Sequence, residues 1–82
     1  MPLFSKEKSK VYLLVYFNDD RPLLKRDSFN SRTRANSIQY FENAIKNQRL
    51  GTISLHNYRT AIIKDMQTNE DIVKYVNGKK RL

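Results

Sequence analysis

The seven residues from Val11 to Phe17 constrain the fold of this chain more than any other segment. All are valine, leucine or aromatic, and a run of this length and character is typical of a β-strand. Asn18 to Pro22 follow with strong turn chemistry, so the strand ends there. Leu23 to Phe29 read as the returning strand of a hairpin. The folded part of the chain is therefore predicted to begin with two antiparallel strands.

The next segment changes its period from two residues to three and four. The apolar residues that recur at this spacing are Ile38, Phe41 and Ile45. Polar side chains occupy the other directions, which is typical of an amphipathic helix, and we expect one over about residues 32–48. Ser31 offers a hydroxyl for the N-cap, and Gly51 lies where a left-handed residue is expected to end the helix.

The last thirty residues allow two interpretations. Two apolar, β-branched runs, Ala61–Met66 and Ile72–Val76, are joined by the polar residues Gln67–Asp71, which predicts two further strands closed by Asn77–Gly78. In the alternative, Thr68 is the N-cap of a final helix, with an acidic residue three positions later. We favour the strands.

Together these elements predict a small α+β domain of β-β-α-β-β order, with one helix packed on an antiparallel sheet. We expect this domain over residues 10–78, a flexible basic arm over residues 1–9 and a basic tail over residues 79–82. The chain has no cysteine, which excludes disulfides and fits a reducing, cytoplasmic compartment. No apolar stretch has the length of a signal peptide core or a membrane span, so we expect no membrane partner.

Charge points to the kind of partner. Sixteen lysines and arginines stand against eight acidic residues, for a formal charge of +8 on 82 residues. A small domain with this surplus attracts polyanions at long range, which favours a nucleic-acid partner. An acidic protein would be attracted by the same charge.

The predicted first strand is apolar on both faces. Its odd-numbered residues point one way, while Tyr12, Leu14 and Tyr16 point the other. If the odd set packs under the helix, the tyrosines lie on the uncovered face, joined by Tyr75 from another strand. There they would stack bases, form a homodimer interface or lie beneath a terminal segment. The alternative is a central strand with both faces simply covered.

The predicted start of the helix is unusually basic. Free backbone N–H groups and the positive end of the helix dipole favour an anion there, yet the chain supplies Arg32 and Arg34 next to the hydroxyl of Ser31. A bound phosphate would relieve the conflict, and Lys25 and Arg26 would extend the patch if the hairpin brings them alongside. The alternative is that these arginines are simply exposed.

A second basic cluster, Lys79-Lys80-Arg81, follows the predicted domain. Such residues often follow phosphates without reading sequence, because they release counterions wherever the backbone passes. Two basic ends and a basic helix start together predict a small, non-enzymatic nucleic-acid-binding protein. The alternative is a small regulator or inhibitor, of viral or mobile-element type, that binds an acidic protein partner.

Catalytic chemistry is not indicated. One histidine, His56, without any cysteine does not make a typical zinc site, and Asp19-Asp20 beside a proline is much more typical of a turn. We find no glycine-rich phosphate loop or nucleophile elbow. We therefore expect no enzyme activity, no cofactor and no metal.

Residues 10–48, as strand, turn, strand and basic helix start, resemble the arm-type DNA-binding module at the amino end of some tyrosine recombinases. The resemblance rests on this pattern and not on a diagnostic motif. It implies that the sheet, not the helix, enters the major groove. It thereby directs attention to Lys25, Arg26 and the outward residues of the first strand.

Overall fold

The computed structural model of the chain describes residues 10–18, 21–28 and 33–82. Its elements follow in the order β1 (Val11–Tyr16), β2 (Leu24–Asp27), α2 (Arg34–Asn47), β3 (Arg49–Leu50), β4 (Ile53–Ser54), β5 (Thr60–Asp65), β6 (Asp71–Val76) and β7 (Lys79–Lys80). The arm predicted over residues 1–9, the pair Asp19-Asp20 and the predicted site residues Ser31 and Arg32 lie outside the described ranges.

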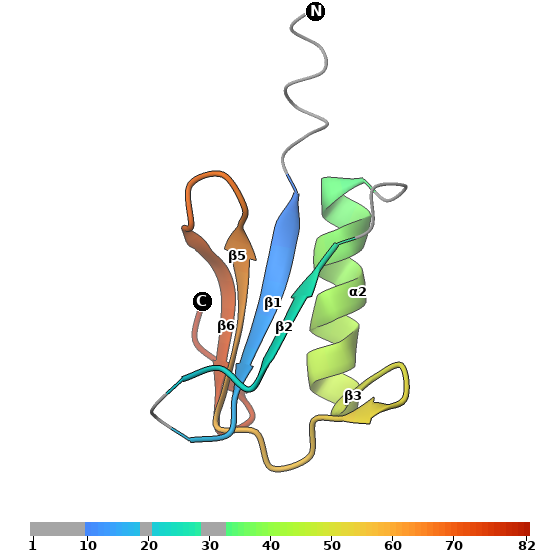
Figure 1. Cartoon of the computed structure of the whole chain (residues 1–82), viewed down its shortest axis with the longest axis vertical. Helices are drawn as coiled ribbons and strands as arrows, with labels where there is room; N and C mark the ends of the chain where they lie inside the picture. The colour runs from blue at the N-terminus through green and yellow to red at the C-terminus, as the bar shows by residue number, and fades with distance from the viewer. Residues whose placement is uncertain (1–9, 19–20, 29–32) are drawn as a thin grey trace, which may run out of the picture.

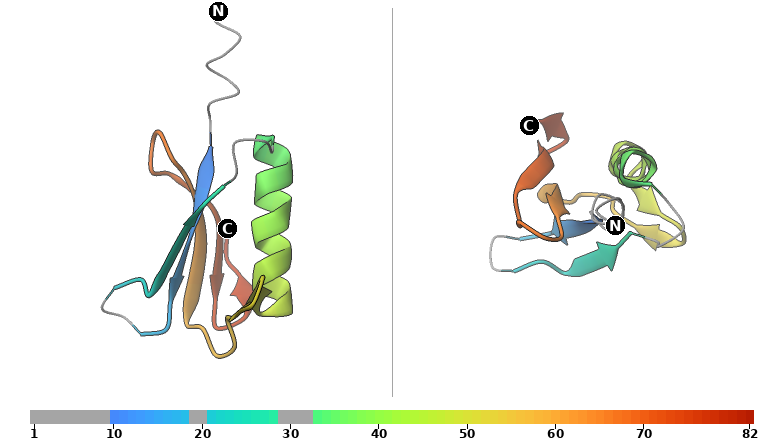
Figure 2. Two further views of the ribbon diagram at one scale, coloured as in Figure 1. Left: turned by 45° about the vertical axis from the view of Figure 1, so that its right-hand side comes forward. Right: turned by 90° about the horizontal axis from the view of Figure 1, so that it is seen from above.

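The main sheet is antiparallel and has the strand order β2-β1-β5-β6-β7, so β1 and β5 lie near its centre. Helix α2 runs along one face of this sheet (Figures 1 and 2), and the short β3–β4 hairpin follows the helix directly. The predicted α+β architecture, one helix on an antiparallel sheet, is confirmed. No helix in the described ranges has the length and apolar character needed to cross a bilayer.

The core lies between α2 and the sheet. In β1 the odd residues Val11, Leu13 and Val15 are fully buried, as the alternation predicted. The helix contributes Phe41 and Ile45 to the same apolar cluster, each about 1 % exposed. The helix and the strand each bury one side in the same core. This burial produces the apolar spacing by which both could be recognised in the sequence.

The ends of α2 differ from the prediction. Thr33 is the N-cap, and its hydroxyl accepts a hydrogen bond from the backbone N–H of Asn36 at 3.1 Å. At the other end Gln48 adopts the left-handed conformation, with φ of 57°, and its N–H bonds to helix carbonyls. Gly51, expected to end the helix, has φ of 61° and lies in the turn between β3 and β4. The chain therefore places its glycine in the tighter turn of the following hairpin.

The C-terminal part consists of strands, so the alternative of a final helix is wrong. Thr68 does not cap a helix, because it lies in the β5–β6 turn. The carboxylate of Asp65 organises this turn by accepting hydrogen bonds from the N–H groups of Gln67 (2.7 Å) and Thr68 (3.0 Å). A local acceptor thus satisfies the backbone groups that would otherwise begin a helix.

Residues 79–82 do not leave the fold as a tail. Asn77 and Gly78, with φ of 52° and 85°, form a two-residue hairpin turn, and β7 then pairs with the end of β6. Both central residues have positive φ, the conformation for which asparagine and glycine are preferred in such hairpins. The pairing continues beyond β7, since the N–H of Arg81 donates to the carbonyl of Lys74 at 2.6 Å. The C-terminal cations are therefore fixed along a sheet edge.

Candidate functional site

The face of the main sheet opposite α2 is called the open face below. Because paired residues of an antiparallel sheet share a face, the strand register assigns its members. They form three rows across the strands: Asp27, Tyr12, Lys64 and Asp71; Lys25, Leu14, Ile62 and Lys74; and Tyr16, Thr60, Val76 and Lys79. Tyr12 and Tyr16 lie opposite the helix, as expected if the odd-numbered residues of β1 pack beneath it.

The centre of the open face is apolar but sealed. Leu14 and Ile62 are each only 8 % exposed, although in the described ranges the helix packs on the other face. Their neighbours in the three rows are largely tyrosines and lysines, whose rings and aliphatic stems cover apolar surface while the polar ends stay in water. The open face therefore presents aromatic and cationic groups rather than bare aliphatic surface.

Tyr12 is held by two contacts. Its hydroxyl donates to the Asn69 side-chain oxygen at 2.8 Å, and the Nζ of Lys25 lies 5.0 Å from the centre of its ring. This distance is within cation–π range, so Lys25 covers part of the ring. The orientation of Tyr12 is therefore fixed by the protein itself.

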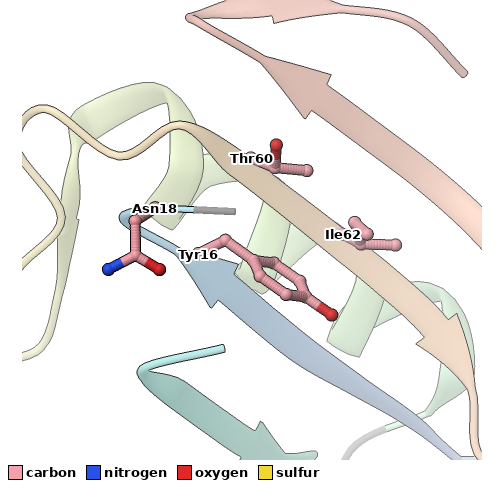
Figure 3. A pocket seen from close by; sticks show the side chains of 4 residues that line it. All are labelled: Tyr16, Asn18, Thr60 and Ile62. Atoms are coloured by element: carbon pink, nitrogen blue, oxygen red, sulfur yellow. The ribbon is translucent and has the colours of Figure 1, made fainter. Parts of the chain in front are cut away.

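Tyr16 has a different environment. It lines a shallow recess of about 190 Å³ together with Asn18, Thr60 and Ile62, as Figure 3 shows. Its hydroxyl makes no hydrogen bond to another residue within the described ranges. Tyr16 is half-buried, and its ring borders a hollow that Asn18 and Thr60 supply with polar groups.

The lysines of the open face fall into two groups. Lys64 pairs with Asp71 at 2.9 Å, and this hydrogen bond raises the pKa of Lys64. Lys25, Lys74 and Lys79 have no carboxylate partner among the residues that the structure describes. Lys25 lies on one side of the sealed centre, and Lys74 and Lys79 lie on the other. The open face thus carries cations along both sides.

The basic helix start is arranged differently from the prediction. The guanidinium of Arg34 donates to the Asp65 carboxylate at 2.6 Å, on the side of the sheet that packs on the helix. The N–H of Thr68, Arg34 and the N–H of Gln67 together lower the pKa of Asp65. Arg34 is therefore engaged by a neighbouring carboxylate instead of standing free for a phosphate.

Lys25 and Arg26, predicted to extend one patch, point to opposite faces of β2. Lys25 pairs with Leu14 on the open face, whereas Arg26 pairs with Leu13 on the helix side and is half-buried. Consecutive residues of a strand alternate in this way. The structure thus separates Lys25 from Arg34 by the thickness of the sheet.

Tyr75 does not join the other tyrosines, so that prediction is wrong. It pairs with Ala61 on the helix side and is 6 % exposed. Its hydroxyl donates to Glu42 of α2 at 2.9 Å, and Lys80 reaches the same carboxylate oxygen at 3.0 Å. Burial, followed by this hydrogen bond, raises the pKa of Tyr75 to about 12, and Lys80 is the main cause of a lowered pKa at Glu42. Through Glu42, Tyr75 connects β6 to the helix and Lys80 connects β7 to it.

Sequence reasoning missed Asn18, Lys64 and Lys74 as members of the site. The alternation in β5 and β6 contained a signal for the two lysines, but their face depends on how many residues the intervening turn absorbs. His56 is exposed, and its Nδ1 lies 3.1 Å from the Gln48 side-chain oxygen. The described residues include no cluster of potential metal ligands.

Comparisons with protein-family models, with curated proteins and with solved structures found no match to this chain. The assignment of a function therefore depends on the geometry of the open face.

Proposed function

We propose that this protein binds nucleic acid through the open face of its sheet. The observation that carries the proposal is the arrangement of Lys25 on one side of the face and Lys74 and Lys79 on the other, with Tyr16 between them. Phosphates need cations and bases need flat apolar surfaces, and this face offers both. The binding surface is thus the sheet and not the start of the helix.

The net charge supports the same partner. A surplus of eight positive charges on 82 residues creates a field that attracts a polyphosphate before any contact forms. The three lysines are available for contact, because none has a carboxylate partner in the described parts of the chain. Arg34 contributes to the field but, bonded to Asp65, is a weak candidate for direct phosphate contact.

A protein partner is less well supported by the same face. Stable protein interfaces bury an apolar centre, and large exposed apolar patches mark them. Here the apolar centre, Leu14 and Ile62, is already sealed by its own neighbours. The large hydrophobic residues that are exposed in the described ranges, Leu23 and Leu82, lie outside the rows of the open face. Nucleic acid fits such a surface better, because its interfaces with proteins are polar, positively charged and rich in bridging water.

The absence of cysteine is consistent with action in the reducing interior of a cell, where nucleic acids are abundant. The proposed activity is one of binding alone. Its phosphate contacts are with Lys25, Lys74 and Lys79, and its aromatic contact is with Tyr16.

The test is an equilibrium titration of labelled oligonucleotides, single-stranded and duplex, at several salt concentrations. We expect binding at low salt whose log-log dependence on salt is linear, with a slope of about −0.7 to −0.9 for each phosphate contacted. Polyglutamate of similar charge serves as the control polyanion. Absence of binding at about 50 mM salt, or equal affinity for polyglutamate, would contradict the proposal, and the second result would favour an acidic protein partner.

A further inference from the structure

We infer that the ligand of the open face is single-stranded and that one of its bases occupies the recess beside Tyr16. This inference rests on the proposed function and adds to it the class of nucleic acid. Its basis is the chemistry of the recess, which combines an aromatic ring, an aliphatic side chain, an amide and a hydroxyl within about 190 Å³.

These four groups match the features of a nucleobase. The ring of Tyr16 offers apolar surface to a flat, π-bonded ligand, and Ile62, although only 8 % exposed, lines the recess beside it. The Thr60 hydroxyl can donate or accept, as the edge of a base requires, and Asn18 contributes a polar side chain to the lining. A phosphate alone would leave the ring and the aliphatic side chain unused. The recess therefore favours a base over a simple anion.

Stacking of a base on Tyr16 favours a single strand over a duplex, in contrast to the major-groove docking that the resemblance to tyrosine recombinase modules implies. Bases in a duplex are stacked on both sides, so none can lie on a protein ring without unstacking, whereas the bases of a single strand are free to do so. Lys25 and Lys74 end the same row, three strand spacings apart, which places their Cα atoms roughly 14 Å from each other. Cations at this separation can hold the backbone on both sides of a stacked base.

Tyr16 and Tyr12 provide a matched pair for a test. Both belong to β1 and to the open face, but Tyr12 is covered by Lys25 and bonded to Asn69, whereas Tyr16 borders the recess. A base should therefore stack on Tyr16 in preference to Tyr12. Tyr16→Leu removes the ring and keeps apolar cover, Tyr16→Phe keeps the ring, and Tyr12→Leu is the control.

The experiment measures the affinity of each variant for three ligands: a single strand, the same strand with abasic sugars, and the duplex of that sequence. For the intact protein we expect the base-bearing strand to bind most tightly. Tyr16→Leu should lower that affinity by roughly 5- to 150-fold, the range found for loss of one base stack, and should leave the affinity for the abasic strand unchanged. Tyr16→Phe should restore binding, and Tyr12→Leu should lower the affinity less than Tyr16→Leu does.

Two kinds of failure are distinguishable. If no strand binds at low salt, the proposed function fails and this inference fails with it. If binding is salt-dependent but the intact protein holds the abasic strand or the duplex as tightly as the base-bearing strand, only the inference is overturned. The comparison of ligands on the intact protein does not depend on whether a variant folds, and thermal melting of each variant checks its fold.

Discussion

Replacing two lysines of the open face should change the salt dependence of binding by a predictable amount. Lys25→Gln with Lys74→Gln removes the cations at the two ends of one cross-strand row and leaves neutral polar side chains that are one atom shorter. If each lysine neutralises one phosphate of a single strand, the log-log slope should become shallower by about 1.4. When the salt concentration rises fourfold, the affinity of both proteins should fall, and the fold-decrease for the double variant should be about seven times smaller than for the intact protein.

The matched control is Lys46→Gln with Arg49→Gln. It removes the same number of positive charges from exposed positions at the end of α2 and in β3, away from the open face. Fluorescence anisotropy of a labelled single strand, repeated at four or more salt concentrations, gives both slopes. We expect the control slope to equal that of the intact protein. If the two double variants give equal slopes, charge acts through the general field alone, and our localisation of the phosphate contacts is refuted.

Three further predictions concern the fold that presents this face. Because the pKa of Asp65 is lower in the folded protein than in the unfolded chain, its contribution to stability is present above about pH 4 and lost as pH falls through the folded pKa. Asp65→Asn should therefore lessen the loss of stability in acid, as urea unfolding at a series of pH values would show. Leu13→Ala, at a fully buried position, should lower the free energy of unfolding by about 2–5 kcal/mol in urea titrations. Gly78→Ala should cost about 1–2 kcal/mol in the same assay, because φ is 85° although a Cβ would meet nothing within 4 Å; no loss would contradict the role given to this turn.

The features that could be predicted from the sequence are those set by local chemistry. The spacing of Ile38, Phe41 and Ile45 identified the helix, since its apolar side must face a core. The apolar, β-branched and aromatic runs identified β1, β5 and β6, and strict alternation put Tyr12 and Tyr16 on the face opposite Val11, Leu13 and Val15. Each of these inferences needs only the period of one element.

The features that could not be predicted depend on contacts distant in sequence. Arg34 looked like a free cation because its partner, Asp65, lies 31 residues further along the chain. Tyr75 faces the helix because an irregularity in the β5–β6 pairing, between Ile63 and Lys64, changes the register, and one residue of shift reverses the face of every following side chain. Neither the Arg34–Asp65 ion pair nor the face of Tyr75 can be inferred from the residues next to them in the sequence.

The environments of Lys79 and Lys80 in β7 could not be predicted either. Lys79 and Lys80 resemble a solvated tail by composition, yet the Asn77-Gly78 turn returns them to the sheet, where Lys80 pairs with Glu42. Two consecutive lysines thus have different environments. Lys79 stays on the open face as a candidate phosphate contact, while Lys80 is engaged on the helix side.

The most direct test of our account compares the methyl groups of adjacent residues by NMR during titration with a single-stranded oligonucleotide. Leu14 and Ile62 belong to the open face, while their chain neighbours Leu13 and Ile63 point into the core beneath the helix. We predict that the methyl signals of Leu14 and Ile62 shift as the strand is added and that those of Leu13 and Ile63 do not. Shifts confined to Leu13 and Ile63, or to the residues of α2, would contradict binding at the open face.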